Sequence, residues 1–177
     1  MKTWIVLGIL AALLCACGGT AAVPTPAPTV AQAIGPLLIQ TADIPPGDTA
    51  DPVQSEVSGL LMYFNLPPKR ELRHQELFKD GKRDGWTTVF LYPSTTDQKL
   101  VYQNFVTQIG DTGHPLDGIG EQSFGDEPTT DSSGSINDMV FVRCGAIAFI
   151  SWDSPSMQTA TDYAKRLDQR LTPILCK

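Results

Sequence analysis

Two pairs of strand-like segments, each followed by an amphipathic helix, constrain the fold of this chain more than any other feature. The first pair spans residues 71–78 and 86–92 around a polar loop that contains glycine, and the second spans 139–144 and 146–152 around a tight turn. Neighbouring strands joined by short turns pair antiparallel. The sequence therefore predicts an α+β fold, an antiparallel β-sheet with two amphipathic helices packed on one face.

Apolar residues at helical spacing define both helices. The first follows capping side chains at residues 94–97 and ends at Gly110, because Val101, Phe105 and Ile109 recur at every fourth position. The second is expected to start at residues 154–156, with Pro173 bending or ending it. Its expected buried face carries Ala160, Ala164, Leu167, Leu171 and Ile174. Its expected outer face carries Asp162, Lys165, Asp168 and Arg170.

The remaining segments are less sharply patterned. Residues 36–43 form a short apolar entry, which ends at a turn signal, and residues 58–66 are a continuous apolar run that fits a buried strand or a short helix. Residues 111–137 are rich in loop-forming residues, with one strand expected at 122–125.

The first sixteen residues predict a lipoprotein signal peptide. Lys2 precedes an apolar run at 4–14, which is shorter than the roughly 20 residues that a membrane span needs. The following Leu14-Cys15-Ala16-Cys17 resembles a lipobox, with an aliphatic residue three positions and a small residue one position before the cysteine. We expect cleavage before Cys17, its lipidation with at least two acyl chains such as palmitate, and stable anchoring to the outer side of the cell membrane. Cleavage before Cys15 is the alternative, but it would place the bulky Leu14 next to the cut, and an ordinary signal peptide is a second alternative.

Residues 17–35 are expected to be a disordered tether that starts at the lipidated cysteine. The segment holds three prolines and no charged or aromatic residue, so it lacks a core-forming pattern. Residues 36–177 are then expected to form a single domain.

The remaining cysteines, Cys144 and Cys176, form a pair in an exported chain. An oxidising compartment favours a disulfide between them. The second helix would run back along the strand at 146–152 and bring Cys176 to the turn that follows Cys144. A redox or metal pair is the alternative, but neither a CxxC spacing nor a nearby histidine favours it.

The charge balance argues against two classes of partner. The chain has 13 basic and 19 acidic side chains, a net charge of −6, and loss of Lys2 makes the mature chain more acidic still. Nucleic-acid binding needs a basic surface, and so does electrostatic adhesion to anionic lipid. We therefore expect no nucleic-acid partner and a membrane contact that depends on the lipid anchor.

Residues capable of chemistry are few. His74 and Glu76 share one face of a predicted strand, which fits a metal or acid–base pair, or a solvated strand face beside basic residues. We expect the solvated face for His74, and we expect His114 to lie in a loop, where the sequence does not identify a partner for it. No nucleophile elbow, phosphate-binding loop or dinucleotide motif occurs.

One acidic stretch could be taken for a calcium site. It contains Asp126, Glu127, Asp131, Asn137 and Asp138, but the spacing of a calcium loop is absent. We therefore expect no metal, no cofactor and no catalytic residue. Most strand aromatics are expected in the core, with one or two lining a ligand groove: Trp86, Phe90, Tyr92, Phe141, Phe149 and Trp152.

Several short motifs together resemble a known family. They are the segments 37–47 and 118–124, the strand pair 141–150 and the final helix at 160–171. In this order they resemble the extracellular sensor domain of mycobacterial receptor Ser/Thr kinases and related lipoproteins. This chain has Asp48 where an aromatic residue is usual and Glu121 in place of an aspartate, and it can form one disulfide where the sensor domain has two. The resemblance implies an α+β domain with a cleft, and it carries over no catalytic residue.

These observations favour a surface-tethered, non-enzymatic binding or sensor-like domain for an envelope ligand, with ligand-binding residues that the sequence does not identify. Two alternatives stay open. One is a structural lipoprotein that docks to another envelope protein through its sheet face. The other is an enzyme with unrecognised chemistry.

Overall fold

The computed structural model describes residues 29–56, 66–67, 70–126, 136–153 and 157–177. In chain order the helices and strands are α1 (Val30–Ile34), η1 (Gly35–Leu37), η2 (Thr41–Asp43), β1 (Asp48–Ala50), β2 (Glu71–Lys79), β3 (Lys82–Leu91), α2 (Thr95–Ile109), β4 (Gly113–Pro115), β5 (Gln122–Asp126), β6 (Ile136–Arg143), β7 (Ala146–Asp153) and α3 (Met157–Leu175). The apolar run at 58–66 lies outside these residues except for Leu66.

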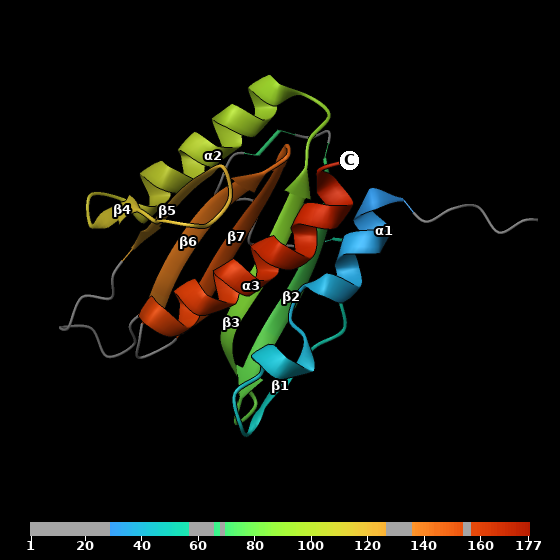
Figure 1. Ribbon diagram of the computed structural model, residues 1–177. Coiled ribbons are helices and arrows are strands. Elements are labelled where there is room, and N and C mark those ends of the chain that lie inside the picture. The colour runs from blue at the N-terminus through green and yellow to red at the C-terminus, as the bar shows by residue number, and fades with distance from the viewer. Residues whose placement is uncertain (1–28, 57–65, 68–69, 127–135, 154–156) are drawn as a thin grey trace, which may run out of the picture.

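The strands form one antiparallel sheet in the order β1-β2-β3-β7-β6-β5-β4 (Figure 1). The two expected hairpins make its centre, because β2 pairs with β3, β6 pairs with β7, and β3 joins the hairpins by pairing with β7. The strand expected at 122–125 is β5. The α+β class and the antiparallel sheet are therefore confirmed. The edge strands β1 and β4 were not expected, since three residues are too few to show an alternating pattern.

The two long helices cover opposite faces of this sheet, so the expected packing on one face is wrong. Along β7, Ala146, Ala148 and Ile150 belong to the apolar cluster of α3, whereas Ile147 and Phe149 belong to the cluster of α2. Successive side chains of a strand point to opposite faces. Because β7 is buried at every position except its last, both faces of the sheet need a covering helix. In Figure 1, α3 lies across the front of the sheet.

Both central hairpins close with two-residue turns. Asp80 and Gly81 have φ values of 51° and 74°, and Cys144 and Gly145 have values of 45° and 82°. Two consecutive residues with positive φ give the turn whose twist matches that of paired strands. The two turns lie at opposite ends of the sheet, because β3 and β7 run antiparallel and Leu91 pairs with Ala146.

Residues 29–35 are folded onto the domain, so the expected disordered tether is wrong for these residues. Thr29 caps α1 with its side chain, and Gln32 returns a hydrogen bond to the Thr29 backbone. Ala31 and Ile34 are fully buried, and Ile34 packs in the cluster of α3. A helix of five residues is too short for a helical pattern to reveal it. Residues 17–28 lie outside the described part of the chain.

The helix α2 has the capping and the buried face that its sequence predicts. Ser94 accepts a hydrogen bond from the backbone of Asp97, and the buried residues are Val101, Phe105 and Ile109. These side chains cover the face of β6 and β7 opposite α3.

The helix α3 agrees with its predicted buried face and disagrees with its predicted outer face. Ala160, Ala164, Leu167 and Leu171 are fully buried. However, Asp168 is 4% exposed and the Arg170 side chain is 17% exposed, because each forms an ion pair with a residue outside the helix. The helix also continues through Pro173 to Leu175, since a proline so near the end removes only a terminal hydrogen bond. None of the helices in the described ranges is long and apolar enough to cross a membrane.

Candidate functional site

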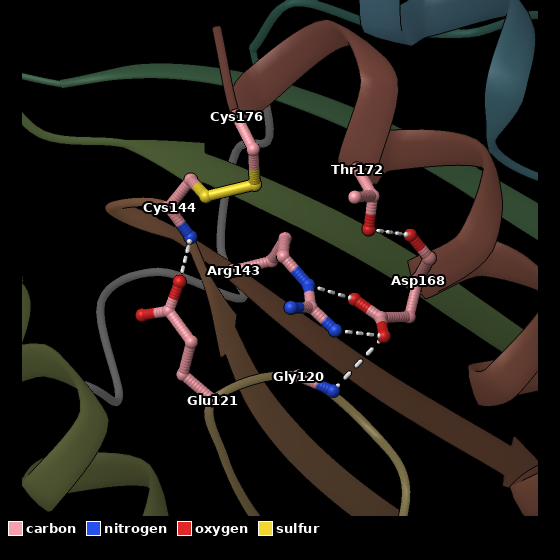
Figure 2. The surroundings of a disulfide bond; sticks show 7 residues. All are labelled: Gly120, Glu121, Arg143, Cys144, Asp168, Thr172 and Cys176. Carbon is pink, nitrogen blue, oxygen red and sulfur yellow. Dashed lines mark hydrogen bonds and ion pairs between the residues drawn. A yellow bond between two sulfur atoms is a disulfide. The ribbon is translucent and has the colours of Figure 1, made fainter.

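A disulfide joins Cys144 to Cys176, as the sequence predicts (Figure 2). The Cα atoms are 5.4 Å apart, within the usual range for this bond. The bond fastens the residue after α3 to the β6–β7 turn. It therefore fixes the end of the chain to one end of the sheet.

A partly buried ion pair between Arg143 and Asp168 fixes α3 to the same end of the sheet. The Arg143 guanidinium donates two hydrogen bonds to the Asp168 carboxylate, with the Nε–Oδ1 distance at 2.6 Å. The Gly120 backbone donates a third to Asp168 at 3.0 Å, and Glu121 accepts from the Cys144 backbone at 2.9 Å. Hydrogen bonding to Asp168 raises the pKa of Arg143. Figure 2 shows these contacts beside the disulfide, so the last part of α3 is held at Asp168 and again at Cys176, directly after the helix.

A cavity of about 610 Å³ opens beside the disulfide. It lies where the start of α1, the start of β2, the end of β3, the β6–β7 turn and the end of α3 meet. Its aliphatic lining comes from Val30, Leu91, Pro93, Ile174 and Leu175. Its volume is typical of a small-molecule site. We call it the end pocket.

Two residues that line the end pocket each carry a buried hydrogen-bond donor without a partner among the described residues. Tyr92 is 5% exposed, and its hydroxyl has no hydrogen-bond partner among the described residues. Arg70 donates from Nη1 to the Pro67 carbonyl at 2.8 Å, but its Nε has no partner within that same part of the chain. Buried donors without partners are rare and cost free energy, so such groups often mark a site that a ligand completes.

The Tyr92 hydroxyl keeps its proton at physiological pH. Burial raises the pKa of Tyr92 to about 12, although the nearby positive charge of Arg70 opposes this shift. Two residues of the pocket lining therefore bring a neutral hydroxyl and a positive charge close together. Gln98 on α2 holds the wall in place by donating to the Tyr92 carbonyl at 2.9 Å.

A second, smaller hollow of about 410 Å³ lies between Tyr102 and the loop at 115–124. None of the residues that line it has a buried polar side-chain atom without a hydrogen-bond partner. We therefore place the candidate site in the end pocket.

His74 is buried, so the expected solvated strand face is wrong. His74 and Glu76 do share a face of β2, with Nε2 and Oε1 separated by 3.5 Å. His74 is 1% exposed because Trp86 lies against its ring and Thr88 hydrogen-bonds to Nδ1 at 2.7 Å. Burial lowers the pKa of His74, against the opposing effect of Glu76. The described residues hold no group of three metal-ligating side chains here or elsewhere.

The other residues considered from the sequence lie apart. His114 lies on the edge strand β4 and not in the expected loop, and β4 is at the edge of the sheet farthest from β1 and β2. Asp126 and Asp138 lie on the paired strands β5 and β6. Burial raises the pKa of Asp138, and the charge of Asp126 raises it further. Glu127 and Asp131 lie outside the described residues, as does Cys17.

The end pocket is made largely of residues that the sequence did not single out. Of the six strand aromatics, Tyr92 lines it, and the other five are buried elsewhere in the core. Arg70, Gln98 and Leu175 come from the ends of three different elements, so no spacing along the chain could group them.

No protein-family model, curated protein or solved structure matches this chain. The resemblance to the kinase sensor domain therefore stays a prediction.

Proposed function

We propose that this protein is a non-enzymatic binding lipoprotein, anchored by Cys17 to the outer side of the cell membrane, that holds a small envelope ligand in the end pocket. The observation that carries the proposal is a cavity of about 610 Å³ with an aliphatic lining and two unsatisfied buried donors. Apolar walls with a few placed polar groups are typical of ligand sites.

The position of the domain relative to the proposed anchor supports this function. Thr29 and Val30, the first residues that the structure describes, lie at the pocket. A chain that leads from Cys17 to Thr29 would thus attach beside the pocket mouth. A disulfide between Cys144 and Cys176 also suits an oxidising extracytoplasmic compartment.

The first test blocks the pocket mouth. Val30 is 49% exposed and lines the pocket, whereas Val53 is 36% exposed and does not. Val30→Trp should fill the mouth and reduce the amount of co-purifying small molecule by about tenfold, equal to 1.4 kcal/mol of binding free energy. Val53→Trp is the matched control and should retain the ligand.

Full-length protein extracted in styrene–maleic acid copolymer avoids detergent, which would compete for an apolar pocket. Mass spectrometry of the solvent-extracted protein then measures the bound molecules. Equal ligand content in the wild type and both variants would contradict the proposal.

The anchor has a separate test. Cys17→Ala should prevent both lipid attachment and processing by the lipoprotein peptidase, leaving the precursor uncut. Incorporation of labelled palmitate in cells measures this directly, with Cys15→Ala as the control that should still be labelled. Label entering the Cys17→Ala protein would show that the anchor lies elsewhere.

A further inference from the structure

The two unpartnered polar groups of the end pocket, Arg70 Nε and the Tyr92 hydroxyl, are both hydrogen-bond donors. A ligand that pairs with them must therefore carry an acceptor. Four arginines pair with carboxylates: Arg83, Arg143, Arg166 and Arg170. Arg70 and Arg73 instead donate to backbone carbonyls within the described ranges, and of these two only Arg70 lines the end pocket. A full positive charge without a counter-charge favours an anion over a neutral acceptor.

The Tyr92 hydroxyl adds a second donor close to the first. Arg70 is near enough for its charge to act on Tyr92, and Tyr92 is 95% buried, with its hydroxyl unpartnered among the residues that the structure describes. Neither atom has accessible surface in the empty pocket, so a headgroup oxygen reaches these two donors only when the Arg70 and Tyr92 side chains shift on binding. It then gains hydrogen bonds that the empty pocket lacks. Glu71 lies on the same strand end but is exposed, where solvent screens its charge.

The rest of the pocket suits a hydrocarbon chain. Val30, Leu91, Ile174 and Leu175 line it from three elements, and Val30 remains half-exposed although it is a large apolar side chain. An alkyl chain against these residues would remove apolar surface from water on both partners.

From these contacts we infer that the ligand is an amphiphile with an anionic oxygen headgroup, bound by Arg70 Nε and the Tyr92 hydroxyl, and with an alkyl tail along Val30, Leu91 and Leu175. This inference rests on the proposed function, because it names the ligand class of the same pocket. Carboxylate and phosphate heads share the required chemistry.

The test uses dodecanoate, dodecyl phosphate, dodecanol and dodecyltrimethylammonium, each with a photoreactive diazirine in the alkyl chain. Each probe is irradiated with the full-length lipidated protein in lipid nanodiscs, and mass spectrometry maps the labelled peptides. The two anionic probes should label peptides that contain Val30 or Leu175. Labelling by the alcohol and the cation should be weaker by at least about tenfold, because they lack the charge that Arg70 recognises.

Variants assign the headgroup contact to its two donors. Tyr92→Phe removes one hydroxyl, and Tyr102→Phe, which removes a hydroxyl outside the end pocket, is its matched control. Tyr92→Phe and Arg70→Gln should each reduce labelling by dodecanoate severalfold, whereas Tyr102→Phe should not. Arg70→Lys keeps the charge and should retain part of the preference, which separates loss of charge from loss of folding.

Two outcomes distinguish a wrong headgroup from a wrong proposed function. Equal labelling of the pocket by dodecanoate and dodecanol would overturn the anionic headgroup and leave a binding pocket in place. Absence of labelling from the pocket by every probe would overturn the proposed function as well.

Discussion

The two ends of the central hairpins share one turn geometry and differ in everything that surrounds it. At one end, Asp80 and Gly81 close β2 and β3 and are exposed, between the exposed Lys79 and Lys82. At the other end, Cys144 and Gly145 close β6 and β7, but here the turn carries a disulfide to the end of α3 and lines the end pocket.

The difference between the two turns shows which contacts form the end pocket. Positive φ at two successive residues closes both hairpins equally well. Only the turn at Cys144 also receives a helix end, the ion pair of Arg143 and Asp168, and the start of α1 nearby. The pocket therefore results from long-range contacts at one end of the sheet and not from the turn itself.

The largest expected effect comes from removing the disulfide. Cys144→Ser with Cys176→Ser should lower the free energy of unfolding by about 3–4 kcal/mol, because the bond closes a loop between residues 32 positions apart. It should also weaken ligand retention, since Ile174 and Leu175 lose their covalent attachment to the sheet. Chemical denaturation of protein with and without reductant measures the first effect. Equal stability of the oxidised and reduced protein would contradict the role given to the bond.

The ion pair at the same end should contribute slightly less. Asp168→Ala leaves the partly buried Arg143 and the Gly120 N–H without their acceptor, and it should destabilise the protein by about 3 kcal/mol. The comparison at the Asp80 end is Arg83→Ala, whose side chain is 51% exposed, and which should cost less than about 1 kcal/mol. Thermal unfolding of both variants checks the difference, and similar losses would remove the contrast between the ends.

The glycine of each turn, Gly81 or Gly145, allows a third comparison of the two ends. Gly81→Ala should cost about 1–2 kcal/mol from its left-handed backbone alone, because a Cβ there meets no atom within 4 Å. At Gly145 a Cβ would lie 3.0 Å from Gln98 Nε2, which holds the Tyr92 carbonyl. Gly145→Ala should therefore cost about 1 kcal/mol more than Gly81→Ala, and it alone should reduce ligand retention. An equal effect on retention would show that Gln98 does not support the pocket.

A smaller effect is expected between the two ends, at His74. Its pKa is lowered in the folded protein, so below the usual value of 6.5 the unfolded chain binds a proton more readily than the folded chain does. Stability from the neutral His74 is thus complete above pH 6.5 and decreases as the pH falls below it. His74→Gln should flatten the pH dependence of the unfolding midpoint between about pH 6.5 and pH 5. Parallel curves for wild type and His74→Gln would refute the assignment.

Local patterns predicted much of the architecture. The spacing of Val101, Phe105 and Ile109 predicted α2, and the two strand-like segments on either side of the tight turn at 144–145 predicted the second hairpin. The disulfide was also predictable, because a helix and a strand of matching length return the chain to the β6–β7 turn.

Other features depend on contacts that no local pattern contains. The helices lie on opposite faces because β7 is apolar on both sides, and a continuous apolar strand does not say which face each helix takes. Asp168 was placed outside since a charged residue on an amphipathic helix is usually solvated, yet Arg143 and Gly120 bury it. The end pocket is lined by residues as far apart in the sequence as Arg70 and Leu175, which come together only when the chain folds.

Hydrogen–deuterium exchange of the full-length lipidated protein, with and without dodecanoate, tests directly whether a ligand binds at the disulfide end of the sheet. If the ligand binds in the end pocket, amides of peptides that contain Val30, Tyr92 or Leu175 should exchange more slowly with the ligand present. Amides around Asp80 and Gly81, at the opposite end of the sheet, should exchange at unchanged rates. Equal protection at both ends, or none at either, would contradict a ligand site at the disulfide end.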